Sequence, residues 1–153
     1  MRILLWLAFF SFECFGATKF VDLNTGYTLS INQKAGTYTI HDQRAPAEFC
    51  GNDSKYICMK SIHVNFAIPK EGVMPDKWEL NGVAYCYVDI FDYKKSDDEI
   101  DEAHLVAISE NGLCHELSGK EPRFLYGKRQ GLIYIDSFSK DGYQRRFVGL
   151  SNR

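Results

Sequence analysis

Apolar and polar residues alternate over several short stretches of the chain, a period of two that is typical of β-strands with one buried face. Residues 27–31 and 37–41 alternate in this way, and the polar residues 32–36 between them predict a hairpin with a longer loop. Residues 56–68 alternate throughout, so we predict one strand there, followed by a break at residues 69–75. The first half of the chain is therefore expected to consist of strands.

Three dipeptides with a strong preference for tight turns lie between β-prone runs in the second half of the chain. They are Asn81-Gly82, Asn111-Gly112 and Asp141-Gly142. Asn-Gly and Asp-Gly tolerate the positive φ angles of type I′ turns, so each predicts a two-residue hairpin. At the first of them, Pro75 and Gly82 could instead frame a short helix.

Only the segment from Ser96 to Leu105 has features of a helix. Ser96 and Glu99 have the spacing of a capping box, and the acidic residues after Ser96 would suit the helix dipole. The segment is short enough to be a loop instead. Regularly spaced strands and turns predict an all-β domain with at most one short helix, in which an antiparallel meander forms a small sandwich or barrel-like structure.

The N-terminal segment differs from the rest of the chain in composition. Arg2 precedes ten almost wholly apolar residues, 3–12, and small residues follow at positions 16 and 17. This is the layout of a signal peptide, and ten helical residues cover only about half of a bilayer core. A buried strand is the alternative. We predict a cleavable signal peptide at residues 1–17 and one periplasmic or extracellular domain at residues 18–153, with no stable membrane insertion.

Export would place the cysteines in an oxidising environment. Removal of the leader leaves four cysteines, which we expect to form two disulfides. Three pairings are possible. We favour Cys50–Cys58, because the residues between them form a short, polar, turn-rich loop, and this leaves Cys86–Cys114 as the second bridge. No CxxC motif and no paired Cys/His spacing occurs, so we expect no zinc site.

The charges are nearly balanced overall, with a net charge of −2, but they are unevenly distributed. Residues 89–102 hold seven acidic side chains against two lysines, whereas residues 120–153 hold eight basic side chains against three acidic ones. Each segment could be a solvated face, or the two could neutralise each other. The acidic run lacks the glycine and the spacing of a calcium loop. We expect no metal ion, no other cofactor and no nucleic acid as a partner.

A candidate binding face follows from the turn predicted at residues 141–142. A two-residue turn there pairs Ile135 with Val148 on an apolar face, and Asp136 with Phe147 on the other face. The second face is rich in aromatic and charged side chains, which dominate protein contacts, although another sheet could also pack over it. The candidate binding residues are Tyr134, Phe138, Tyr143, Arg145, Arg146 and Phe147.

The chain contains no recognised catalytic motif. It has no HExxH, no GxSxG and no GxxxxGK sequence, and Cys114 and His115 would point to opposite faces of a strand. In format only, a leader followed by a small disulfide-bearing β domain resembles exported inhibitors and periplasmic immunity proteins. We therefore predict a non-enzymatic protein-binding module of this kind, whose partner is another protein. A small-ligand or lipid carrier in a β-barrel and a small secreted hydrolase are the alternatives.

Overall fold

The computed structural model describes residues 19–96, 99–109, 111–137 and 144–150, and it describes no side chain of residues 95, 96 and 99. The described residues are mostly β-strand, which confirms the prediction of an all-β fold. None of the described residues belongs to a helix of sufficient length and apolar character to cross a membrane. The predicted leader, residues 1–17, lies outside the described residues.

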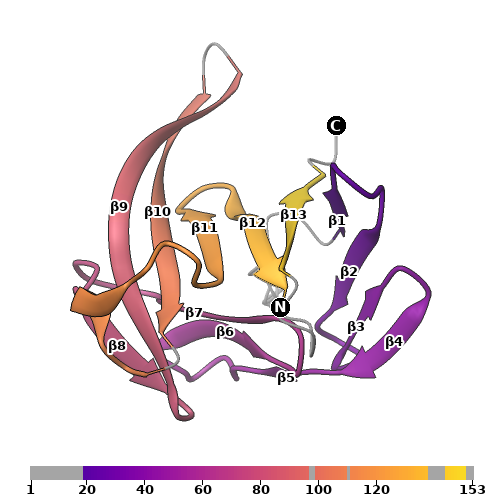
Figure 1. Ribbon diagram of the computed structural model, residues 1–153, viewed down its shortest axis with the longest axis horizontal. Coiled ribbons are helices and arrows are strands. Elements are labelled where there is room, and N and C mark those ends of the chain that lie inside the picture. Colours follow the sequence, from indigo (N-terminus) through magenta and orange to yellow (C-terminus); the bar gives the residue numbers. More distant parts are fainter. Residues whose placement is uncertain (1–18, 97–98, 110, 138–143, 151–153) are drawn as a thin grey trace, which may run out of the picture.

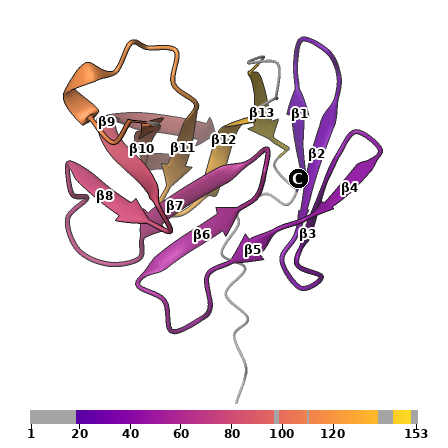
Figure 2. The ribbon, with the colours of Figure 1, turned by 60° about the horizontal axis from the view of Figure 1, so that its bottom comes forward.

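The strands form two antiparallel sheets, one of ten strands and one of three. The large sheet curves into an arc, and the small sheet lies across the open side of this arc (Figure 1; Figure 2). In sheet order, the large sheet consists of β4 (Gln43–Pro46), β3 (Thr37–Ile40), β2 (Thr28–Asn32), β1 (Lys19–Asp22), β13 (Arg145–Gly149), β12 (Gly131–Ser137), β11 (Arg123–Gly127), β10 (Glu99–Ser109), β9 (Val83–Ser96) and β8 (Lys77–Leu80). The small sheet consists of β5 (Glu48–Phe49), β6 (Tyr56–Lys60) and β7 (Asn65–Pro69).

The main core lies between the two sheets, as it does in a sandwich. Phe66 of the small sheet meets Phe124 of the large sheet edge to face, with ring centroids 5.9 Å apart. Trp78 stacks on Tyr85 at 5.7 Å, and its indole N–H donates a hydrogen bond to the carbonyl oxygen of Ala67 at 3.2 Å. The edge strand β8 is thereby attached to the small sheet as well as to β9.

Two of the predicted hairpins are present. Strands β2 and β3 form the hairpin expected at residues 27–41, with Ile31 opposite Tyr38. Asn81 and Gly82 have φ angles of 52° and 74° and join β8 to β9, with Leu80 opposite Val83. These are the features of a two-residue type I′ turn, so the alternative of a short helix there is wrong.

The structure does not confirm the other two predicted turns, and it divides one predicted strand into a hairpin. No tight hairpin forms at Asn111-Gly112, because β10 ends at Ser109 and a 3₁₀ helix (Cys114–Glu116) lies before β11. The turn predicted at Asp141-Gly142 lies outside the described residues. The single strand predicted over residues 56–68 is in fact the β6–β7 hairpin, whose turn is closed by a hydrogen bond from the Ser61 hydroxyl to the Val64 carbonyl oxygen at 2.8 Å.

The helix predicted from Ser96 to Leu105 is wrong, since the described residues of this segment belong to strands β9 and β10. Both faces of β10 are buried: Val106 lies in the main core, and Leu105 packs with Leu125 and Ile133 in a second cluster on the outer face. A strand that is apolar on both faces loses the clean alternation by which strands are recognised in a sequence.

Both predicted disulfides form. Cys50 and Cys58 lie with Cα atoms 5.2 Å apart, and Cys86 and Cys114 lie with Cα atoms 5.4 Å apart. The second bridge connects β9 to the 3₁₀ helix and so anchors the long connection between β10 and β11. Two disulfides within one chain are compatible with an oxidising, exported environment.

One acidic residue of the 89–102 segment has a structural role. The Asp101 carboxylate is buried and accepts hydrogen bonds from the backbone N–H groups of Arg129 and Gln130, at 3.0 and 2.9 Å. It therefore holds the turn between β11 and β12. Gly127 lies directly beside this carboxylate, and a Cβ atom at this position would overlap it. The turn and its neighbour Lys128 are thus positioned by a buried charge.

Candidate functional site

The inner face of the large sheet is incompletely covered where the β9–β10 hairpin projects beyond the small sheet (Figure 1). Val106 and Phe124 are opposite each other on β10 and β11 and are fully buried in the main core. The next row of side chains toward the hairpin tip is Ile90, His104 and Tyr126. This row is the point at which the core opens into a cleft.

The other wall of the cleft comes from the end of β7 and the segment that follows it. Ile68 is buried at the base, Met74 is half-buried, and Val73 is exposed at the rim. The cleft has a volume of about 610 Å³. Its lining is formed by Ile57, Ile68, Pro69, Lys70, Gly72, Val73, Met74, Tyr87, Ile90, Glu102, His104, Tyr126 and Lys128.

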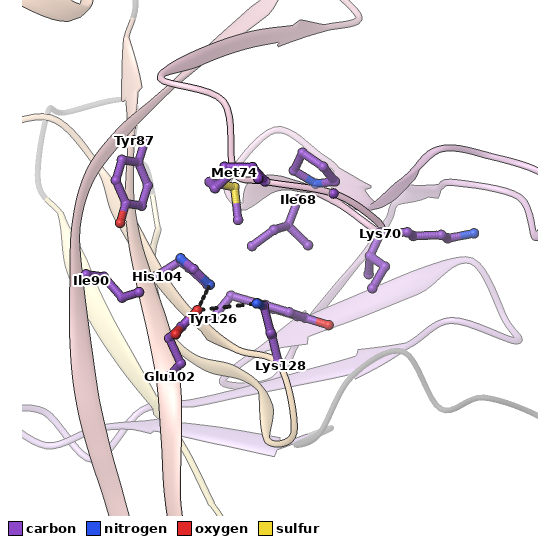
Figure 3. Close-up of a pocket in the computed structure, with 13 residues that line it drawn as sticks. Ile68, Lys70, Met74, Tyr87, Ile90, Glu102, His104, Tyr126 and Lys128 are labelled. Carbon is purple, nitrogen blue, oxygen red and sulfur yellow. Dashed lines mark ion pairs between the residues drawn. The ribbon is translucent and has the colours of Figure 1, made fainter.

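Three polar side chains form one side of the cleft, with Glu102 in the centre (Figure 3). Glu102 and His104 are two residues apart on β10, so they project from the same face of the sheet. The Glu102 Oε1 atom lies 3.3 Å from His104 Nε2 and 3.3 Å from Lys128 Nζ. Lys128 follows β11 and faces Glu102 because Ala103 is opposite Gly127 in the ladder. The pairing of Glu102 with Lys128 leaves no net charge at this side of the cleft.

His104 is only 5% exposed. The contact of Nε2 with Glu102 does not have the geometry of a hydrogen bond, so neither ring nitrogen has a hydrogen-bond partner among the described residues. Burial lowers the pKa of the His104 imidazole, and the Lys128 ammonium lowers it further. Together these effects outweigh the Glu102 and Asp101 carboxylates, which raise the pKa. Near neutral pH the ring is therefore uncharged. The Tyr87 ring lies above it, with ring centroids 6.0 Å apart.

This lowered pKa predicts that acid destabilises the protein through His104. The unfolded chain takes up the proton more readily than the native state, so the free energy of unfolding falls as the pH drops below the ordinary imidazole value of 6.5. We expect a smaller fall in the variant His104→Gln, measured by urea unfolding between about pH 7 and pH 5. The matched control is His115→Gln, because His115 is exposed. Equal slopes in wild type and His104→Gln would contradict the prediction.

The chemistry of the cleft favours binding of an apolar group. Most of its lining is aliphatic or aromatic, its two central charges neutralise each other, and the buried nitrogens of His104 face no open space. Within the described part of the chain, no three His, Cys, Asp or Glu side chains come together as a metal site requires. The exposed side chains of Glu102 and Lys128 supply hydrogen-bonding groups at the mouth, and the exposed Lys70 lies on the other wall.

The binding face predicted on β12 and β13 is only partly assembled. In the structure Ile135 lies opposite Phe147, and Asp136 lies opposite Arg146, one residue away from the predicted register. A shift of one residue moves every side chain of a strand to the other face. Phe147 consequently lies fully buried in the main core instead of on the predicted aromatic face.

The remaining candidate residues are divided between two faces. Arg146 is exposed, covers the Tyr134 ring at 4.5 Å, and binds the buried Asp136 carboxylate through Nε at 2.9 Å and a second nitrogen at 3.1 Å. Arg145 projects from the opposite face of β13 and lies over the Tyr27 ring at 4.3 Å. Phe138 and Tyr143 lie outside the described residues. A binding role for this set of residues stays a prediction.

The sequence did not predict the cleft as a binding site. The available signal was the pair Glu102-x-His104, because residues two apart on a strand share a face. The predicted helix over residues 96–105 obscured that signal, since the same two residues would diverge on a helix. For the wall formed by Ile68 and Met74 no local signal exists, because only the packing of the two sheets brings it opposite β10.

The chain matches no protein-family model, and no curated protein and no solved structure matches it significantly.

Proposed function

We propose that the protein is an exported, non-enzymatic binding module that recognises another protein through the cleft. In this proposal an apolar side chain of the partner enters between Ile68 and Met74 on one wall and the row of Ile90, His104 and Tyr126 on the other. The paired charges of Glu102 and Lys128 at the mouth would offer hydrogen bonds to the backbone of the partner.

The observation that carries the proposal is the exposure of apolar side chains at the cleft and beyond it. Val73 at the rim and Ile90 on the opposite wall are exposed, Val73 to 94%. Ile100 is also exposed on the inner face of the projecting hairpin, beyond the charged row of Asp92 and Glu102. Exposed apolar side chains among polar ones are typical of contact surfaces. Ile100 does not line the cleft, so a small molecule in the cleft would leave it in water, whereas a protein surface could cover it together with Val73.

The volume of the cleft supports a second candidate function, the binding of a small amphipathic molecule. About 610 Å³ lies within the range of small-molecule sites, which are concave and mostly apolar with a few polar groups. This candidate predicts that a small molecule co-purifies with the protein and is detected by native mass spectrometry.

Capture experiments with charged variants test the main proposal. The tagged full-length protein is expressed in its native host, and the proteins captured with it are quantified by mass spectrometry. We expect Val73→Glu and Ile90→Glu to reduce capture of the specific partner about tenfold or more, because each variant places a carboxylate in the apolar contact.

The matched control is Ile62→Glu. Ile62 is 71% exposed in the β6–β7 turn and does not line the cleft, so this variant adds the same charge at another exposed apolar position. Capture should be retained in this control. A partner that is lost equally from all three variants, or retained by all three, would contradict the proposal.

A further inference from the structure

The projecting part of β9 has one edge without a strand partner among the described residues. Strand β9 pairs with β10 along almost its whole length, but with β8 only from Val83 to Cys86. One further hydrogen bond joins the Tyr87 N–H to the Asp76 carbonyl oxygen at 3.0 Å. Beyond Tyr87 no described strand pairs with this edge, and free strand edges are templates for pairing with another strand.

The start of this edge is blocked by local features. The register of β9 against β10 shifts near Val88, which is the extra residue of a bulge. The Ile90 N–H is occupied by the Asp89 carboxylate at 2.8 Å, and it therefore points away from β10. Successive residues of a strand direct their backbone N–H and C=O groups to alternate edges of the strand. The backbone groups of Asp92 and Lys94 therefore point to the free edge, as those of Ile90 do. The accessible part of the edge is thus centred on Tyr93.

We propose that two copies of this chain pair antiparallel through the β9 edge, about a two-fold axis at Tyr93. In this register Asp92 of each copy lies directly opposite Lys94 of the other copy. Both residues are exposed and lie on the same face of the strand, so two opposite-charge pairs form across the axis. Their backbone groups form the hydrogen-bonded pairs, which join the two large sheets into one continuous sheet.

The charges select this register over its neighbours. Directly opposed residues of an antiparallel pair lie on the same face of the sheet. The two-fold axis must therefore lie at a residue, and not between two residues, because the latter would oppose residues of different faces. An axis at Asp92 would oppose two aspartates, which is destabilising, and an axis at Phe91 would oppose Asp92 and Ile90. Among residues 90–94, only the axis at Tyr93 places unlike charges opposite each other. The pairing does not depend on the proposed function, since its hydrogen bonds use the edge of β9 and neither Asp92 nor Lys94 lines the cleft.

Substitutions that reverse the charge of Asp92, of Lys94 or of both residues test the pairing. The full chain is expressed for export, purified with both disulfides formed, and its association is measured by sedimentation equilibrium over a range of concentrations. We expect a monomer–dimer equilibrium in the wild type. Asp92→Lys and Lys94→Asp should each weaken dimerisation about tenfold or more, because each creates two like-charge pairs. The double exchange Asp92→Lys with Lys94→Asp should restore it.

General charge repulsion predicts a different result. The chain carries a net charge of −2, so repulsion alone would make Asp92→Lys associate more strongly and Lys94→Asp less strongly. Asp42→Lys, at an exposed position outside β9, changes the net charge equally and should leave dimerisation unchanged. Thermal melts verify that each variant is folded. A monomeric wild type, a strengthened Asp92→Lys dimer, or a folded double variant that stays monomeric would overturn the proposal.

Discussion

Replacing Gly127 by alanine should lower the free energy of unfolding by about 2–4 kcal/mol, although it adds only one methyl group. The new Cβ atom would overlap the Asp101 carboxylate. Moving this carboxylate breaks its hydrogen bonds to the N–H groups of Arg129 and Gln130 and leaves a buried charge without donors. Loss of one partner of a buried charge is among the costliest single changes.

Urea unfolding of the oxidised protein measures this effect, with Gly51→Ala as the control. Gly51 has no neighbouring atom within 4 Å of an added Cβ and does not adopt a positive φ angle. Its replacement should therefore change stability by no more than about 0.5 kcal/mol. If the two variants unfold at the same urea concentration, Asp101 does not hold the β11–β12 turn as the structure indicates.

Removing the Cys86–Cys114 bridge should cost about 3.5 kcal/mol, and removing Cys50–Cys58 about 2.5 kcal/mol, according to the loop-closure entropy of the unfolded chain. The sequence separations are 28 and 8 residues, and the longer loop loses more entropy when it is closed. Paired alanine substitutions remove each bridge without leaving a lone thiol. Cys86 is fully buried, so its replacement also leaves a small void and adds to the difference.

Each double variant serves as the control for the other, because both replace two bonded cysteines by alanine. Urea unfolding midpoints and slopes are measured for each protein. We expect the variant without Cys86–Cys114 to be clearly less stable than the variant without Cys50–Cys58. The reverse order would mean that the connection between β10 and β11 is anchored by other contacts.

The projecting β9–β10 hairpin connects the candidate site to the proposed dimer. Its inner face carries Ile90 and His104, which form one wall of the cleft, and Asp92 and Lys94 lie on the same face of β9 nearer the hairpin tip. The proposed ladder hydrogen bonds come from the backbone of β9, whose N–H and C=O groups lie perpendicular to the side chains. One hairpin can therefore serve both interactions, and the variants above separate them.

The sequence by itself determined the features that depend on neighbouring residues. The positive φ angles tolerated by Asn81-Gly82 predicted the β8–β9 turn, and short-range alternation predicted the hairpin of β2 and β3. The pairing Cys50–Cys58 followed from the short turn-rich loop between its cysteines, and Cys86–Cys114 was then the remaining pair. Together these local signals were sufficient for the all-β class.

Only the tertiary structure decided which faces are buried and which segments meet. The segment around His104 had local features of a helix, but pairing on both sides and burial of both faces made it a central strand. The register of β12 and β13 placed Phe147 in the core, because it is set by the pairing of whole strands and a shift of one residue exchanges their faces. The cleft likewise exists because β9 and β10 are longer than the sheet that covers them, and contacts between distant segments have no signature in any single stretch of sequence.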